Sequence, residues 1–360
     1  MTHPRHIVFV LPDLRFGGGQ RVILALARRF VELGLRVDIV NLAGDGELIE
    51  EVPLGVRHVP LATSSKYSKW RLALTVVPKL AAFLRREKPD AILSSMTGAN
   101  LATMLACSIC AFQGRVVLRE AASTTNAKPS VLRLVRVLYR RANAIVAVSK
   151  GVADDLRAQR LPNARLVVIP NPVDVERLRA RAQEPSVLPD APYLVSVGRM
   201  TPQKDHATLL KAYVMSRART SHRLVIVGDG PEAAQLRELA IRLCVGPRVD
   251  FTGALANPFP MIAGASLFVL SSRWEGYPNV LLEALALDVP VVSTDCPAGP
   301  SELLDAGRYG VLVPVGDIER LAGAIDLAIA RPAPATQAVV DSHRPDLIAQ
   351  RYLQVLEGDP

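Results

Sequence analysis

Short apolar runs alternate with amphipathic stretches along the whole chain, and this alternation constrains the fold more than any other feature. The first apolar runs are residues 7–11 and 37–42, and between them residues 22–33 have helical spacing that stops at Gly34. Strands and helices alternating at this spacing predict βαβ units, a parallel sheet and helices on both faces. Further strands are expected at 91–95, 116–119 and 144–149, and helices near 70–87, 99–112, 130–141 and 150–158.

The pattern restarts at Tyr193, which predicts a second domain of the same kind. With 360 residues, the chain also exceeds what one ordinary core holds. Strands are expected at 193–198, 223–228, 249–252, 267–270, 289–294 and 310–313, and helices at 205–218, 231–243 and 317–330.

The domain boundaries follow from the composition between the two halves. Residues 172–192 are rich in proline and charged side chains and are interpreted as a linker. The predicted domains are 1–171 and 193–340, both doubly wound α/β sheets that face each other across a cleft at the carboxyl ends of their strands. Residues 341–360 contain a separate helix, a candidate to pack back on the first domain.

One strand–turn–helix segment has the features of a ligand site. The strand Leu267–Leu270 leads to Glu275-Gly276-Tyr277-Pro278-Asn279-Val280-Leu281-Leu282-Glu283, in which the apolar spacing predicts a helix packed on the sheet. Pro278 suits the first helical position, where the N–H that it lacks would have no partner. A helix start attracts an anion, and the carboxylates of Glu275 and Glu283 suit hydroxyls. An anion flanked by hydroxyls indicates a sugar nucleotide.

A glycine-containing loop follows the first strand of each domain. Gly17-Gly18-Gly19 opens the first helix, where a bare backbone allows a ligand to come close; a plain tight turn is the alternative. This loop is not G-x-G-x-x-G, and no acidic residue ends the second strand, which argues against NAD. Gly198-Arg199 and Lys204 begin the second domain's loop, where the two cations are expected to neutralise a pyrophosphate. Solvated surface charge is the alternative there.

Three further strand ends are weaker candidates. Arg119-Glu120 ends a strand of the first domain, so it is expected to point into the cleft as an acceptor-side candidate. Residues 228–232 and 295–302 follow strands of the second domain, where turn chemistry or a rigid turn explains them equally well.

The sequence shows no metal site or cofactor motif. The four cysteines are too few and scattered for a disulfide framework, and Cys107 and Cys110 fall in an apolar helical pattern typical of buried structural thiols. The six histidines lack metal-ligand spacing, and no D-x-D triplet occurs. We therefore expect no cofactor and no bound metal.

Charge is unevenly distributed along the chain. The net charge is +9, but residues 1–170 hold 25 Lys and Arg against 12 Asp and Glu, whereas residues 171–360 hold 18 against 22. A basic domain suggests an anionic partner such as a membrane surface, and solubility alone is the alternative. The candidate contacts are residues 66–71, Lys79, Arg85, Arg86, Arg133, Arg136, Arg140 and Arg141. The basic half lacks clustered aromatic residues, which disfavours nucleic acid.

Hydropathy favours a cytoplasmic protein. No apolar run reaches the roughly 18 residues of a membrane span. The first predicted strand begins so early that a signal peptide is not expected. The basic first half is compatible with peripheral attachment to the cytoplasmic face of the inner membrane.

The ordered set of motifs resembles the large glycosyltransferase family 4, whose members are retaining enzymes of the GT-B fold. The Gly-rich loop, the Gly-Arg…Lys loop and Glu-x7-Glu occur in the family's order with Ser149-Lys150-Gly151 and residues 170–174 and 310–314. The match spans nearly the whole chain. The segment from Glu275, with residues 295–300, is most similar to bacterial hexosaminyl- and hexosyltransferases that extend lipid-linked or surface polysaccharides, lipopolysaccharide among them.

The resemblance implies two Rossmann-like domains and a role for each motif. Arg199 and Lys204 would bind the donor pyrophosphate, Glu275 the sugar hydroxyls and Glu283 the ribose. Residues completing the donor-binding set would be Gly18, Gly19, Gly198, Gly276, Tyr277, Pro278, Asn279 and Val280. The chain departs from the family at Leu287-Asp288, where a small residue with Gly is common. It also has no His between 59 and 205, where many relatives have one near the acceptor.

The predicted function is transfer of a hexose or N-acetylhexosamine, with retention, from a nucleotide diphosphate sugar to a lipid-linked or polysaccharide acceptor. UDP is favoured over GDP as the nucleotide. The alternatives are a sugar-nucleotide epimerase on the same scaffold and a non-catalytic nucleotide-sugar-binding subunit of a polysaccharide assembly complex. An epimerase would need acid and base residues in the cleft, and the shortage of histidine speaks against it.

Overall fold

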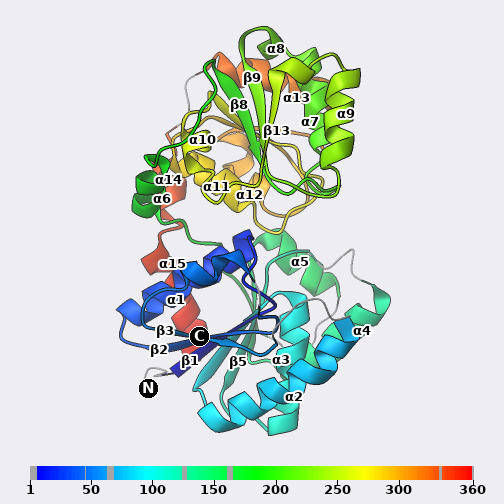
Figure 1. The fold of residues 1–360 in the computed structure, drawn as a ribbon. Coiled ribbons are helices and arrows are strands. Elements are labelled where there is room, and N and C mark those ends of the chain that lie inside the picture. The colour runs from blue at the N-terminus through cyan, green and yellow to red at the C-terminus, as the bar shows by residue number, and fades with distance from the viewer. Residues whose placement is uncertain are drawn as a thin grey trace. The chain divides into compact units, whose positions relative to one another are not determined.

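The chain folds into two units, each built on one parallel sheet. A computed structural model describes residues 6–44, 46–62, 69–123, 128–159, 165–331 and 335–358. Unit 1 comprises Met1–Pro172 with Pro345–Pro360, and unit 2 comprises Val173–Arg344 (Figure 1). No helix within these described ranges is long and apolar enough to cross a bilayer.

The sheet of unit 1 has seven parallel strands in the order β3-β2-β1-β4-β5-β6-β7. The strands are β1 His6–Leu11, β2 Arg36–Asn41, β3 Val56–Pro60, β4 Ala91–Ser95, β5 Arg115–Glu120, β6 Ala144–Ala147 and β7 Arg165–Val168. The helices are α1 Gly18–Glu32, η1 Glu47–Glu51, α2 Lys69–Glu87, α3 Thr97–Cys110, α4 Pro129–Leu138, η2 Tyr139–Arg141, α5 Lys150–Ala158 and α15 Pro345–Glu357. The direction of winding reverses between β1 and β4, and doubly wound sheets bind ligands at the carboxyl ends of such strands.

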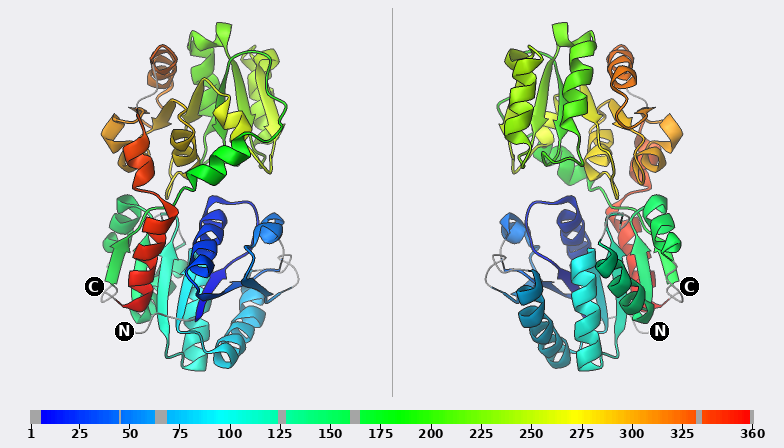
Figure 2. Two further views of the ribbon diagram at one scale, coloured as in Figure 1. Left: turned by 90° about the vertical axis from the view of Figure 1, so that its left-hand side faces the viewer. Right: turned by 90° about the vertical axis from the view of Figure 1, so that its right-hand side faces the viewer.

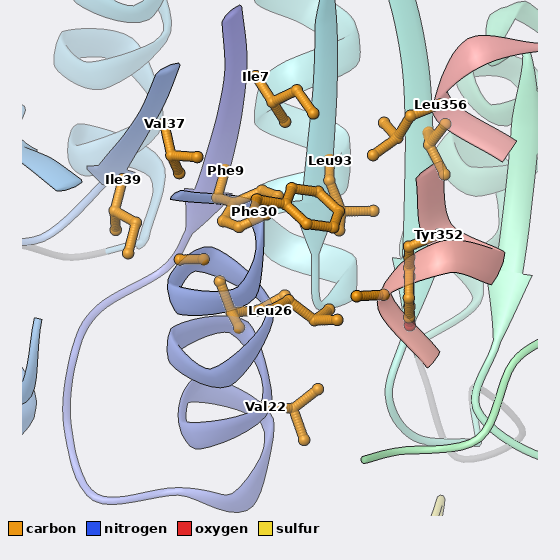
Figure 3. Packing of buried hydrophobic residues seen from close by; sticks show 14 of the residues in the cluster. Ile7, Phe9, Val22, Leu26, Phe30, Val37, Ile39, Leu93, Tyr352 and Leu356 are labelled. Carbon is orange, nitrogen blue, oxygen red and sulfur yellow. The ribbon is translucent and has the colours of Figure 1, made fainter. Parts of the chain in front are cut away.

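One core cluster of unit 1 joins the sheet to helices α1 and α15 (Figure 3). The rings of Phe9 and Phe30 lie 5.5 Å apart between centroids, and α15 adds Tyr352 and Leu356 to the same cluster. Helix α15 contacts α1, β4 and β5 and lies in unit 1 in both views of Figure 2, where it is red. Unit 1 is therefore assembled from two separate parts of the chain.

The sheet of unit 2 has six parallel strands in the order β10-β9-β8-β11-β12-β13. The strands are β8 Tyr193–Val197, β9 Arg223–Val227, β10 Val249–Gly253, β11 Leu267–Leu270, β12 Val291–Thr294 and β13 Val311–Val313. The helices are α6 Val175–Ala182, α7 His206–Met215, α8 Ala218–Ser221, α9 Ala233–Arg242, η3 Gly246–Arg248, α10 Phe259–Ala263, α11 Asn279–Ala286, α12 Pro300–Leu303, η4 Asp305–Gly307, α13 Ile318–Ile329 and α14 Gln337–Asp341. Here the winding reverses between β8 and β11, so the loops that follow these two strands are neighbours.

The segment predicted as a linker, residues 172–192, contains helix α6 and belongs to unit 2 from Val173 onward. Asp174 caps α6 by accepting a hydrogen bond from the backbone N–H of Arg177 at 3.1 Å. The guanidinium of Arg181 lies 5.2 Å from the centroid of the Phe259 ring in α10. Arg181 Nη2 also donates to the carbonyl of Ala256 at 3.2 Å, so charged side chains take part in holding this helix on unit 2. Unit 2 therefore extends beyond the predicted 193–340.

Candidate active site

The loops after β8 and β11 are joined by hydrogen bonds at the carboxyl edge of the unit 2 sheet. The hydroxyl of Ser271 donates to the carbonyl of Lys204 at 2.8 Å, and the N–H of Arg273 donates to the carbonyl of Gln203 at 2.8 Å. Arg273 Nε also donates to Asp205 Oδ2 at 2.9 Å. Asp205 caps α7 from a left-handed backbone conformation, with φ at 46°. These contacts fix the position of the Lys204 backbone.

Lys204 and Glu275, which the sequence assigns to one site, form a direct ion pair. Lys204 Nζ lies 2.6 Å from Glu275 Oε1, with side chains 17% and 6% exposed. Ser272 Oγ donates to the same carboxylate oxygen at 2.6 Å, while Gln203 Nε2 lies 3.5 Å from Glu275 Oε2. Removing one partner of such a buried pair leaves the other charge uncompensated. The pair therefore presents a fixed cation beside a carboxylate with one well-bonded and one weakly bonded oxygen.

Gly198 makes room for the Lys204 side chain. A Cβ atom at Gly198 would lie 3.0 Å from Lys204 Cε and 3.2 Å from its Cδ and Cγ. Gly228, with φ at 137°, packs behind it, since a Cβ there would lie 2.1 Å from the Gly198 carbonyl oxygen. The two glycines thus allow the loop after β9 to pack closely against the loop after β8, which carries Lys204. A direct contact of Gly198 with a donor stays a prediction.

Arg199 is exposed, in contrast to Lys204. Its guanidinium makes no hydrogen bond or ion pair with any residue in the part of the chain that the structure describes. It follows Gly198 directly, so its charge is held in the same loop as Lys204. The two cations predicted for one anion therefore differ: one is fixed by an ion pair and the other is open to solvent.

The segment 275–283 forms the predicted turn and helix, with one difference. Helix α11 begins at Asn279, so Pro278 is its N-cap and not its first helical residue. The side chain of Pro278 makes no capping hydrogen bond. Gly276 and Tyr277 are buried, whereas Asn279, Val280 and Glu283 are half-buried. The candidate segment 295–302 packs on this turn, since a Cβ at Gly299 would lie 2.5 Å from Pro278 Cδ.

Two further side chains around Lys204 were not singled out from the sequence as site residues. His206 is the first residue of α7 and is buried. Its burial lowers the pKa of the imidazole to about 4; the positive charge of Lys204 lowers this pKa further, and the negative charge of Asp205 raises it. Burial, with the charge of Glu275, raises the pKa of the Cys296 thiol to about 12. Near pH 7 the imidazole is therefore neutral and the thiol protonated. Lys204 and Glu275 are the charged side chains at the centre of this cluster.

In unit 1, the Gly-rich loop leads into α1 as predicted. Gly17 is the N-cap residue of the helix and has no side chain that could cap it. A Cβ at Gly17 would lie 2.4 Å from Gln20 Oε1, so the Gln20 side chain folds over the loop. A Cβ at Gly19 would lie 3.9 Å from Arg119 Nη1, which places the helix start beside this guanidinium. The roles of Gly18 and Gly19 toward a donor stay a prediction.

Arg119, predicted to point into the cleft as an acceptor-side candidate, is enclosed by other residues of unit 1. Its exposed fraction is 0%. Nε donates to the Tyr352 hydroxyl at 3.1 Å, Nη1 to Ser95 Oγ at 2.9 Å and Nη2 to Asn171 Oδ1 at 2.5 Å. The local pattern did not indicate this burial, because Asn171 and Tyr352 come from distant parts of the chain. The guanidinium thus links β5 to β4 through Ser95, to α15 through Tyr352, and to Asn171, which lies just before the chain leaves unit 1.

Glu120 is equally buried, on the side of α3. Its carboxylate accepts hydrogen bonds from Thr97 Oγ1 and Asn100 Nδ2, both at 3.0 Å, and from the Tyr139 hydroxyl. Burial raises the pKa of Glu120, and these hydrogen bonds oppose the rise. Arg119 and Glu120 thus have structural partners inside unit 1, and a role of either toward an acceptor stays a prediction.

Metal-ligand clusters are missing from the described ranges: no three His, Cys, Asp or Glu side chains gather there in a way that could hold an ion. The expectation of a cofactor-free protein stays a prediction.

Two family models cover most of the chain. The model of Glycosyltransferase Family 4 matches residues 16–177, and that of Glycosyl transferases group 1 matches residues 191–331. The chain belongs to glycosyltransferase family 4. This membership confirms the family that the motif order indicated.

Two relatives resemble the chain to different extents. An N-acetylgalactosamine-N,N'-diacetylbacillosaminyl-diphospho-undecaprenol 4-alpha-N-acetylgalactosaminyltransferase of Campylobacter jejuni is 34% identical over 51% of this chain. The chain spans about half of that relative, 49% of its length. A lipopolysaccharide core biosynthesis glycosyltransferase of Rhizobium meliloti is 29% identical over 96% of this chain and 97% of its own.

Solved structures support the fold. The Anabaena protein HepE, determined in complex with UDP and glucose, superimposes with a TM-score of 0.82, covering 98% of this chain and 100% of its own. The sequences are 20% identical, so this likeness concerns the fold alone. The predicted fold class of two Rossmann-like domains of the GT-B type is confirmed.

Proposed function

We propose that this family 4 protein is a retaining glycosyltransferase. It would transfer a hexose or N-acetylhexosamine from a nucleotide diphosphate sugar, preferably a UDP-sugar, to a lipid-linked or polysaccharide acceptor in cell-surface glycan synthesis. The Lys204–Glu275 pair carries the proposal, because it places a fixed cation against a carboxylate at the ligand-binding edge of unit 2. The names of the Campylobacter and Rhizobium relatives support this class of acceptor, and the UDP and glucose of the Anabaena structure support this class of donor.

The residues of unit 2 suit the departure of a nucleotide diphosphate. Negative charge grows on the pyrophosphate as its bond to the sugar breaks, and fixed donors aimed at that charge lower the barrier. Lys204 and Arg199 supply two cations from one loop, and the start of α11, whose N-cap residue Pro278 forms no capping hydrogen bond, supplies the positive end of a helix dipole. These groups would stabilise the leaving group.

Glu275 suits the sugar and Glu283 the ribose. One oxygen of Glu275 is held by Lys204 and Ser272, so the other is the better acceptor for sugar hydroxyls. Glu283 lies in α11, near the same turn. In the proposed reaction, the bond from the anomeric carbon to the phosphate oxygen breaks. The acceptor oxygen bonds to that carbon on the same face, and its proton passes to the leaving phosphate.

The proposal predicts that nucleotides stabilise the protein. A ligand at 100 times its dissociation constant adds about 2.7 kcal/mol to the free energy of unfolding. UDP is expected to raise the melting temperature more than GDP, and a Lys204→Ala variant is expected to lose most of this shift. Incubation with UDP-sugars and a lipid-linked saccharide, followed by NMR of the new linkage, checks transfer and retention. A protein that neither nucleotide stabilises would contradict the proposed donor.

We further propose that unit 1 contacts an anionic membrane surface through helices α3 and α4. Between Asp90 and Asp154 the sequence has eight Lys and Arg residues but one acidic residue, Glu120, which is buried. The basic side chains exposed on or just after α4 are Arg133, Arg136, Arg140 and Arg141. Such a surface attracts anionic headgroups by about 1 kcal/mol per cation.

Exposed apolar side chains accompany these cations. Leu105 and Ile109 on α3 are 39% and 57% exposed, and Leu134 and Val137 on α4 are 49% and 62% exposed. Arg141 Nη1 donates to Ser108 Oγ at 3.2 Å, which joins the end of the α4 segment to α3. We call the exposed residues of these two helices the α3–α4 surface. Cations interleaved with apolar side chains are typical of segments that lie in the membrane interface. Lys66, Tyr67 and Ser68, also predicted contacts, lie outside the described residues.

A double variant tests the α3–α4 surface. Arg133→Gln with Arg136→Gln is expected to weaken binding to liposomes containing anionic lipid by about 30-fold, the equivalent of about 2 kcal/mol for two cations. Cosedimentation at several salt concentrations measures this. The matched control removes two exposed cations of unit 2, Arg242→Gln with Arg320→Gln, and is expected to bind like the wild type. Binding that ignores lipid charge and salt would contradict the proposed contact.

A further inference from the structure

The buried Tyr277 of the candidate donor turn forms a hydrogen bond with a histidine that lies 66 residues away in sequence. Its hydroxyl contacts His343 Nε2, and both residues are buried. Burial raises the pKa of the Tyr277 hydroxyl, so it stays protonated. Tyr277 lies between Glu275 and the start of α11, so this contact fixes the backbone of the turn itself.

The orientation of His343 is determined by its other ring nitrogen. Nδ1 lies 2.6 Å from the carbonyl oxygen of Val339 and 2.9 Å from Ser342 Oγ. A carbonyl can only accept a hydrogen bond, so the proton is assigned to Nδ1. Nε2 is then an acceptor, and the Tyr277 hydroxyl is the donor. Both nitrogens are therefore used in a single arrangement of the ring.

His343 also lies where the chain enters and leaves unit 2. Its carbonyl accepts the N–H of Val173 at 2.8 Å, and Val173 is the first residue of the unit, while Arg344 is the last. The segment that leads to His343 is joined to the far end of α11, since Thr336 Oγ1 donates to the Leu285 carbonyl at 2.9 Å. Both ends of α11 are thus attached to the segment that leaves the unit.

We propose that His343 is a positioning residue: through Tyr277 it fixes the turn 276–279 in the conformation that receives the donor. The proposal rests on the function proposed above, because that turn is taken as a wall of the donor site. His343 contacts no reacting atom in this role. It acts by holding the backbone N–H groups at the start of α11. Because His343 also bonds Val173, the position of these N–H groups depends on both ends of the unit 2 segment, at Val173 and Arg344.

Hydrogen exchange without any ligand tests the positioning directly. Tyr277→Phe is expected to speed amide exchange in residues 276–283 about tenfold, the equivalent of one lost buried hydrogen bond. His343→Leu is expected to do the same, whereas His343→Gln keeps an acceptor near Nε2 and is expected to retain part of the protection. The matched control is Tyr213→Phe, which removes another buried hydroxyl of unit 2, bonded to the His222 carbonyl at 2.7 Å. It is expected to leave exchange in 276–283 unchanged.

The affinity for UDP, measured by calorimetry on the same full-length variants, separates positioning from general stability. Tyr277→Phe is expected to raise the dissociation constant three- to tenfold, and Tyr213→Phe to leave it unchanged at a similar loss of melting temperature. Unchanged exchange in 276–283 for both Tyr277→Phe and His343→Leu would overturn the inference. If the wild type does not bind UDP, the proposed donor fails, and the exchange measurement still decides the role of His343.

Discussion

Lys204→Ala is expected to lower the turnover number at least a hundredfold. Removing one fixed donor to a transition-state charge costs about 3 kcal/mol in well-studied sites. Here the substitution also leaves Glu275 without the cation that lies 2.6 Å away, so the carboxylate is expected to shift toward Ser272 and Gln203. Steady-state kinetics with the UDP-sugar identified by the nucleotide screen measures the effect.

The neighbouring lysine of α7 provides the control for this variant. Lys211 is exposed in the same unit, and Lys211→Ala is expected to keep the wild-type turnover number. Arg199→Ala is expected to show a loss comparable to that of Lys204→Ala, because both cations are assigned to the leaving group. Near-normal turnover of folded Lys204→Ala and Arg199→Ala would rule out this assignment. The melting temperature of each variant separates lost chemistry from lost folding.

Arg119→Met is expected to destabilise unit 1 by about 3 kcal/mol or more. The substitution leaves the buried oxygens of Ser95, Asn171 and Tyr352 without the guanidinium that donates to them, and each unsatisfied buried group costs about 1–3 kcal/mol. Because a whole domain is stable by only about 5–15 kcal/mol, such a loss is large. Urea denaturation, with hydrogen exchange in α15 as a local probe, measures it.

The result also decides between two roles for this arginine. The control Arg133→Met changes an exposed side chain and is expected to alter stability by less than about 0.5 kcal/mol. If Arg119→Met keeps the stability of the wild type but loses transfer to the acceptor, the acceptor-side role predicted from the sequence gains support. If unit 1 is destabilised as expected, the principal role of Arg119 is to hold Asn171 and Tyr352 in place.

The sequence predicts the features that depend on local pattern. Apolar runs at strand length identify β11 with its observed bounds, Leu267–Leu270, and the glycine and proline signals place the turns that follow. The assignment of Lys204 and Glu275 to one site follows from the parallel sheet, which collects the carboxyl ends of β8 and β11 at one edge. Their direct contact could not be predicted, since it depends on side-chain positions across 71 residues of chain.

The features that the sequence did not reveal depend on distant partners. Arg119 ends a strand in the sequence and was expected to point into the cleft, and its enclosure depends on partners such as Tyr352 of α15. His343 lies in a short polar stretch with no motif, and its position becomes meaningful only through Tyr277. Helix α6 was not predicted, because prolines flank it and its own sequence is rich in charged residues. In each case, local composition gives no signal for a contact made over tens or hundreds of residues.

The return of α15 to unit 1 has a consequence for synthesis on the ribosome. Unit 2 is one continuous segment, Val173–Arg344, whereas the unit 1 core lacks Tyr352 and Leu356 until the last helix has emerged. At about 5–20 residues per second, the 172 residues of unit 2 delay completion of that core by roughly ten to thirty seconds. Unit 2 is therefore complete in the nascent chain before unit 1. During that interval the apolar surface that α15 covers on α1, β4 and β5 stays open to solvent, and exposed apolar surface of this kind makes a nascent chain prone to aggregation.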